Sequence, residues 1–135
     1  MTLFLDANVI IYLIEGAQEF RARAAERING YVKENPSSRM AVSRLSWLEC
    51  RVKPLREQNQ KALDAYESFF AEPDLIIVDL TAPVVETATQ IRAAIGFSTP
   101  DALQAACALQ IPGRVQVITN DVRFQKVAGL TVEAV

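Results

Sequence analysis

The chain has 135 residues, of which 50% are hydrophobic and 22% are charged. This length and composition exclude a largely disordered chain and predict one globular domain over residues 1–135. The formal net charge of -2 excludes a strongly basic protein, and the absence of histidine excludes a Ser-His-Asp triad and a His-ligated zinc site.

The first predicted strand covers residues 3–5 and ends on Asp6. Its short apolar run is typical of a strand that is buried on both faces of a parallel sheet. A helical pattern over 8–15 follows, and Gly16 ends it. Two interpretations of Asp6 remain open. It caps this helix, as Asp often does, or it lies in the crevice beyond the strand ends, where open α/β sheets bind ligands.

Further helices surround the second predicted strand. An amphipathic helix over 17–34 precedes a strand at 40–42. A helix over 44–53 follows this strand, and we expect Pro54 to interrupt it. The next helix is predicted at 56–70.

Glu49 lies within an apolar stripe of the helix over 44–53. Leu45, Leu48 and Val52 form this stripe at helical spacing. Carboxylates are almost never fully buried unless they are paired or bind a cation. Glu49 is therefore a candidate functional residue, although it would also fit at the edge of the stripe, paired with Lys53.

The second half of the chain continues the alternation of strands and helices. The predicted elements are a strand at 75–78, a helix at 81–94, a helix at 102–110, a strand at 115–118, a short helix at 122–127 and a strand at 130–132. Asp101 opens one helix, where the helix dipole favours an acid even without a function. Asp121 follows the strand at 115–118, directly after Thr119 and Asn120.

This alternation predicts an α/β protein. We expect a three-layer α/β/α sandwich around a central, mostly parallel five-stranded sheet. The carboxyl ends of parallel strands share one edge of the sheet. The pattern therefore predicts that four acids gather at this edge: Asp6, Glu49, Asp101 and Asp121.

Four carboxylates at one edge predict a metal site. The sequence offers no obvious Lys or Arg partner at three of them. Carboxylates crowded together raise one another's pKa values, and a divalent cation relieves that repulsion. Ligation by carboxylate oxygens alone favours Mg²⁺ or Mn²⁺ over zinc. Such sites hydrolyse phosphodiesters. No Walker loop or GxGxxG segment is present, which disfavours nucleotide-dependent enzymes.

The ordered motifs of this chain resemble the PIN domain nucleases, and within them the VapC-type toxins of prokaryotic toxin–antitoxin pairs. The resemblance covers essentially the whole chain. Its motifs are Phe4-Leu-Asp6-Ala-Asn8, Ser43 with Glu49 six residues on, Thr99-Pro-Asp101-Ala-Leu, and Thr119-Asn-Asp121 followed by Phe124 and Gly129-Leu. It implies a metal-dependent endoribonuclease that cleaves tRNA or other structured RNA. It also implies inhibition by a cognate VapB-like antitoxin and, commonly, a homodimer.

The resemblance also implies a role for each acid. The family's acidic quartet maps onto the four residues named above. Asp6, Asp101 and Asp121 would be direct or water-mediated ligands of Mg²⁺ or Mn²⁺, and Glu49 a ligand or a positioner of the attacking water. The supporting polar residues would be Asn8, Ser43, Thr119 and Asn120. Gln104 departs from many relatives, which carry His or another polar residue there, and this departure bears on substrate preference.

Two other functions remain open. One is a PIN-like module that binds RNA or protein without cutting, which a metal titration and a ribonuclease assay would reveal. The other is a phosphoryl-transfer domain, because such domains also place an acid after the first strand. Against the second, the segment Asp6-Ala-Asn8 lacks the second Asp of the phosphatase motif, and no Lys follows a late strand.

The sequence also indicates where the protein resides. Cys50 and Cys107 are single and distant, which argues against a disulfide framework and fits a reducing compartment. No stretch approaches the roughly 18 apolar residues of a membrane helix, and the chain begins with a strand pattern, not a signal peptide. We therefore expect a soluble, cytoplasmic protein.

Overall fold

Five parallel strands form the central sheet. The computed structural model describes all of residues 1–135. The strands are β1 (Thr2–Leu5), β2 (Arg39–Ser43), β3 (Ile76–Val78), β4 (Val115–Thr119) and β5 (Val132–Ala134). They lie in the order β3-β2-β1-β4-β5, and every neighbouring pair is parallel. The predicted five-stranded sheet is thus confirmed, and it is parallel throughout.

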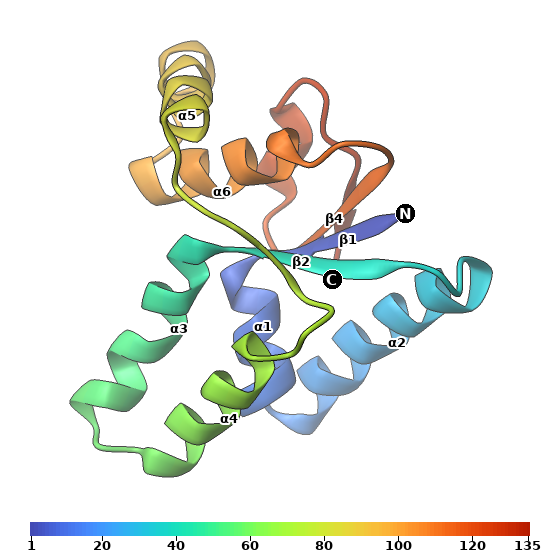
Figure 1. The fold of residues 1–135 in the computed structure, drawn as a ribbon, viewed down its shortest axis with the longest axis vertical. Coiled ribbons are helices and arrows are strands. Elements are labelled where there is room, and N and C mark those ends of the chain that lie inside the picture. Colours follow the sequence, from blue (N-terminus) through green and yellow to red (C-terminus); the bar gives the residue numbers. More distant parts are fainter.

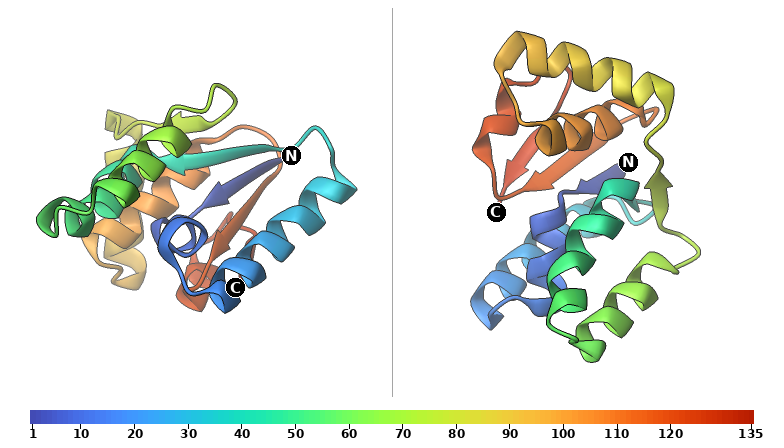
Figure 2. Two further views of the ribbon diagram at one scale, coloured as in Figure 1. Left: turned by 90° about the horizontal axis from the view of Figure 1, so that it is seen from below. Right: turned by 90° about the vertical axis from the view of Figure 1, so that its left-hand side faces the viewer.

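Helices cover both faces of this sheet (Figures 1 and 2). They are α1 (Ala7–Glu15), α2 (Gln18–Glu34), α3 (Arg44–Arg56), α4 (Gln60–Phe70), α5 (Ala82–Ile95), α6 (Thr99–Gln110) and the 3₁₀ helix η1 (Val122–Lys126). Helices α1 to α4 lie on one face and α5, α6 and η1 on the other. This confirms the three-layer α/β/α sandwich. None of the helices has both the length and the apolar character that crossing a lipid bilayer would require.

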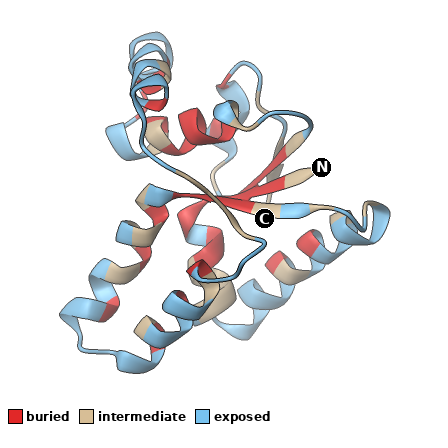
Figure 3. Cartoon of the chain, viewed as in Figure 1, coloured by how far each residue is buried: buried red, intermediate tan, exposed pale blue.

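Strand β1 separates two hydrophobic cores. Successive side chains of a strand point to opposite faces. Leu3 and Leu5 accordingly pack with α1 to α4, whereas Phe4 packs with α5 and α6. All three are buried, and Figure 3 shows the buried residues concentrated along the strands and the inner faces of the helices. The apolar run at the start of the chain is therefore the centre of the molecule.

The order of the strands creates a crevice beside β1. From β1 the chain adds β2 and β3 on one side, and then crosses over to add β4 and β5 on the other. Neighbouring crossovers on opposite faces leave a crevice at the carboxyl ends of the strands where the order reverses. Asp6 follows β1 at this point, and its backbone N–H donates to the carbonyl of Ile118 in β4 at 3.0 Å.

Two predicted boundaries around α3 are wrong. Pro54 does not interrupt α3, which continues to Arg56, and α4 begins at Gln60 rather than at residue 56. A proline inside a helix costs about 3 kcal/mol relative to alanine. Pro54 is buried, in the last turn of α3, and α3 packs against α4. Tertiary packing therefore outweighs the local preference.

The predicted buried stripe of α3 is also wrong. Of its three residues, Leu48 and Val52 are exposed and Leu45 is half-buried, while the buried residues of this helix are Ser46, Cys50 and Pro54. These small residues recur every four positions, so they form one face along which the helix packs closely. Leu48, Val52 and Leu55 turn outward, whereas the partly buried Trp47 packs against the core beneath α1 to α4. The last strand also differs, since β5 covers Val132–Ala134 and not residues 130–132.

Candidate active site

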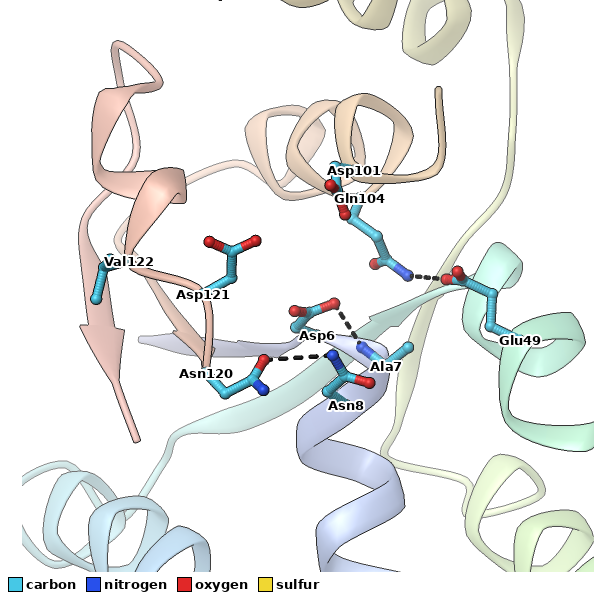
Figure 4. A pocket seen from close by; sticks show the side chains of 9 residues that line it. All are labelled: Asp6, Ala7, Asn8, Glu49, Asp101, Gln104, Asn120, Asp121 and Val122. Carbon is cyan, nitrogen blue, oxygen red and sulfur yellow. Dashed lines mark hydrogen bonds between the residues drawn. The ribbon is translucent and has the colours of Figure 1, made fainter. Parts of the chain in front are cut away.

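A polar pocket lies at the carboxyl edge of the sheet, next to the end of β1 (Figure 4). The residues that line it are Asp6, Ala7, Asn8, Glu49, Asp101, Gln104, Asn120, Asp121 and Val122. The four predicted acids thus come together from four separate parts of the fold. One follows β1, one lies in α3, one lies in the first turn of α6 and one follows β4.

Asp6 is the most deeply placed of these acids, with only 8% of its surface exposed. Its Oδ1 accepts from the backbone N–H of Ala7 at 2.7 Å, and its Oδ2 accepts from the Thr119 hydroxyl at 2.8 Å. Burial raises the pKa of Asp6 to about 6, against these two hydrogen bonds, and the charges of Glu49 and Asp101 add to the rise. Asp6 therefore occupies the place that both interpretations predict, because it caps α1 and also lines the pocket.

Glu49 does not pair with Lys53. Its Oε1 accepts a hydrogen bond from Gln104 Nε2 at 2.9 Å, and the same nitrogen donates to Ser46 Oγ at 2.9 Å. Gln104 and Ser46 are both buried. Helices α3 and α6, which lie on opposite faces of the sheet, are thus joined at the pocket by a side-chain network.

Asp101 and Asp121 share a cation that the sequence analysis missed. The guanidinium of Arg123 contacts Asp121 Oδ2 at 2.5 Å and Asp101 Oδ2 at 3.1 Å. It also lies over the ring of Phe97, 5.8 Å from the ring centroid. Hydrogen bonds from the Arg123 side chain hold the pKa of Asp121 below its usual range, although burial acts in the opposite direction.

The expectation that three of the acids lack a basic partner is therefore wrong. Two of the four are paired with one arginine, which η1 carries two residues after Asp121. The backbone N–H and the side chain of Arg123 both donate to Asp121 Oδ1, so the tight turn itself brings the guanidinium to the carboxylate. The spacing of Asp121 and Arg123 is the only signal that the sequence offers for this pair.

The predicted supporting residues lie in three different places. Asn8 donates to Asn120 Oδ1 at 3.3 Å, and both line the pocket. Thr119 lies beneath the pocket, where it donates to Asp6 and accepts from the backbone N–H of Asp121 at 3.0 Å. Ser43 is not at the pocket: it is fully buried and caps α3 by accepting from the backbone N–H of Leu45.

The pocket has the oxygen ligands that a hard divalent cation prefers. Carboxylate and amide oxygens line it, and one of them, Gln104 Oε1, is buried without a hydrogen-bond partner. In this arrangement, however, no three carboxylate or thiol side chains are placed so that they could hold a metal ion. Arg123 occupies oxygens of two of the four acids. Metal ligation by these acids therefore stays a prediction.

Comparisons with known proteins agree with this fold. Residues 3–130 match the family model of the PIN domain. No curated protein matches the sequence.

Similar folds occur in solved toxin–antitoxin complexes. VapBC-1 from nontypeable Haemophilus influenzae has a TM-score of 0.76 at 20% identity, over 99% of this chain and 98% of that one. VapBC2 from Rickettsia felis, bound to a DNA fragment from its promoter, has a TM-score of 0.73 at 20% identity, with coverage of 99% and 98%. A toxin–antitoxin complex from Klebsiella pneumoniae has a TM-score of 0.69 at 21% identity, with coverage of 97% and 96%.

Proposed function

The chain belongs to the PIN domain family, and on that premise we propose that it is a divalent-metal-dependent endoribonuclease. The reaction is hydrolysis of RNA phosphodiester bonds, with tRNA or another structured RNA as substrate. One observation carries this proposal: four carboxylates from four separate elements line one pocket at the carboxyl edge of a parallel sheet. Repelling charges of this kind are costly to bring together unless a cation joins them.

We assign different roles to the four acids. Asp6, Asp101 and Asp121 would hold Mg²⁺ or Mn²⁺, and Glu49 would be a further ligand or would orient the attacking water. A divalent cation bound there supplies positive charge against the phosphate and lowers the pKa of a water molecule. Thr119 fixes the Asp6 carboxylate, and Gln104 fixes that of Glu49. Asn8 and Asn120 offer neutral polar groups at the edge of the pocket.

We also propose that the protein is the toxin of a toxin–antitoxin pair. The similar solved structures, which are VapBC and toxin–antitoxin complexes, support this proposal through their fold. The partner would be a VapB-like antitoxin that covers the acidic pocket. The toxin itself would be a single-domain, cytoplasmic homodimer, and light scattering on the purified protein would return twice the chain mass.

A second function has one observation in its favour. Arg123 neutralises Asp101 and Asp121, so the pocket is partly satisfied without a metal ion. A PIN-like module that binds RNA or protein without cutting would keep such a pair. The two functions differ in whether the folded protein binds Mn²⁺ and cleaves RNA.

The test is cleavage of total cellular RNA by the purified protein, freed of any partner, with Mg²⁺ or Mn²⁺. We expect discrete fragments with the wild-type protein and none with EDTA or with Asp6→Asn, which removes a charge at almost constant size. Asp64→Asn is the matched control, because Asp64 lies on the exposed face of α4, outside the pocket, and this variant should cleave normally. Full activity of Asp6→Asn would refute the mechanism. A folded wild-type protein that neither binds Mn²⁺ nor cleaves RNA would favour the binding module.

A further inference from the structure

Gln104 is a buried polar residue on an alanine-rich helix. Only 2% of its surface is exposed, and its neighbours Ala105 and Ala106 are buried in the core. Its side chain nevertheless reaches the acidic pocket, which it lines together with the four acids. A buried amide in this position needs partners for both its nitrogen and its oxygen.

The partners of the nitrogen determine how the amide is oriented. Nε2 lies 2.9 Å from both Ser46 Oγ and Glu49 Oε1. An ionised carboxylate only accepts hydrogen bonds, so the group that faces Glu49 must be a donor. The opposite orientation would set the amide oxygen against the carboxylate oxygen. The chemistry of Glu49 therefore directs Oε1 of Gln104 away from that acid.

This oxygen has no hydrogen-bond partner. Gln104 Oε1 is one of two buried side-chain polar atoms in the protein that lack one. In Figure 4 it lies on the side of the amide that faces Asp6, inside the pocket. A buried acceptor left without a donor costs about 1–3 kcal/mol. The unpaired oxygen therefore points to a donor that enters the pocket with a ligand.

We propose that Gln104 is a positioning residue of the metal site: it holds Glu49 through Nε2 and accepts, through Oε1, a hydrogen bond from the hydration shell of the divalent cation. This inference rests on the proposed function, because it needs the cation to bind among the four acids.

The chemistry of a hydrated cation fits this oxygen. Mg²⁺ gives up water reluctantly and usually keeps several water molecules when it binds to a protein. Water molecules on a cation turn their hydrogens outward, so they need acceptors and not donors. The pocket has a volume of about 330 Å³, which leaves room for several water molecules around an ion. The carboxylates can bind the ion directly, while the neutral amide oxygen suits a water molecule.

The test compares Gln104→Leu with the wild-type protein by calorimetric titration with Mn²⁺. Leucine keeps much of the volume but has no polar atom. We expect Mn²⁺ binding to weaken about tenfold, the lower end of what loss of such an outer contact costs. Cobalt(III) hexaammine, whose ammine ligands donate hydrogen bonds but do not exchange, should also bind more weakly to the variant.

A matched control lies on the same helix. Gln110 of α6 is exposed and donates to Thr87 outside the pocket, so Gln110→Leu should bind Mn²⁺ as the wild-type protein does. Thermal melts without metal ions show whether each variant is folded. If Gln104→Leu does not fold, Gln104→Met carries the same comparison with a more flexible side chain.

The possible results distinguish a failure of this inference from a failure of the proposed function. If the wild-type protein does not bind Mn²⁺, the proposed function and this inference both fail. Unchanged Mn²⁺ binding by folded Gln104→Leu overturns only the inference. If that variant binds Mn²⁺ normally but binds RNA more weakly, the oxygen contacts the substrate instead. If Mn²⁺ binding weakens but hexaammine binding does not change, Gln104 acts only by holding Glu49 in place. That result would overturn the proposed contact between Oε1 and the hydration shell.

Discussion

At the residue scale, Arg123 governs whether Asp101 and Asp121 are free to take up a cation. Its guanidinium occupies oxygens of both carboxylates, and it is an exposed side chain that can swing away. A metal ion that uses these acids must displace it. Arg123→Ala should therefore bind Mn²⁺ a few-fold more tightly than the wild-type protein, as measured by calorimetric titration.

Lys126→Ala on the same 3₁₀ helix is the control, because Lys126 belongs to η1 but does not line the pocket. It should leave Mn²⁺ affinity unchanged. Weaker binding by Arg123→Ala would mean that the arginine supports the metal site and does not compete with the cation.

The raised pKa of Asp6 predicts how the stability of the metal-free protein depends on pH. Burial raises this pKa from 3.8 to about 6, so the folded protein binds the proton more tightly than the unfolded chain. The resulting stabilisation is complete below pH 3.8 and is lost as the pH rises through about 6. From about pH 8 to about pH 5, the wild-type protein should gain about 1–2 kcal/mol relative to Asp6→Asn.

Urea denaturation in EDTA measures this difference. Asp6→Asn is the reference because asparagine does not titrate, while every other carboxyl group is common to the two proteins. A stability difference that stays constant across this pH range would show that Asp6 is not held in a desolvated environment.

The sequence predicts which acids meet, but not their partners. Asp6 and Asp121 follow adjacent strands, and alternation alone is enough to bring them to one edge. Gln104 and Glu49 are 55 residues apart and belong to helices on opposite faces of the sheet, so no local pattern connects them. The motif that contains Ser43 does not show where its side chain lies: its hydroxyl caps α3, and it does not line the pocket.

At the scale of elements, Gly16 makes the tight connection between α1 and α2. The sequence predicts that Gly16 ends this helix, and α1 does end there. Its φ of -67° is accessible to any residue, so a left-handed conformation is not the reason for glycine. The reason is space, because a Cβ at this position would lie 2.5 Å from the carbonyl oxygen of Tyr12.

Two glycine substitutions should therefore have opposite effects. Gly16→Ala should destabilise the protein by about 1–3 kcal/mol, because the backbone of α1 must shift. Gly30→Ala should stabilise it by about 0.5–1 kcal/mol, because Gly30 lies within α2 and a Cβ there meets nothing within 4 Å. Thermal melts of both variants measure the difference. Equal effects would contradict the crowding at Gly16.

The buried face of α3 was predicted wrongly because the prediction followed the large apolar residues of the helix. Periodicity identifies a stripe of large apolar residues, and burial usually follows such a stripe. Here the buried side has small residues, and they allow α3 to approach its neighbours closely. Leu48, Val52 and Leu55 stay exposed. The distinction depends on which helices pack against α3, and that information is not local.

At the scale of the whole molecule, the order of the strands places the pocket. Alternating strands and helices predict a parallel sheet, and all strand ends then share one edge. They do not by themselves specify that β1 lies at the centre, between β2 and β4. That order brings the end of β1 next to the end of β4. The apolar run of β1, buried on both faces, is the sequence feature that agrees with this central position.

The central claim is that the four acids hold a divalent cation, and the most direct test is anomalous diffraction from crystals grown with Mn²⁺. We predict an anomalous peak inside the pocket, in contact with Asp6 and at least one of Asp101 and Asp121, with Arg123 moved away from the carboxylate that binds. A folded protein that shows no peak there in excess Mn²⁺, with Arg123 still joining Asp101 and Asp121, would contradict the claim.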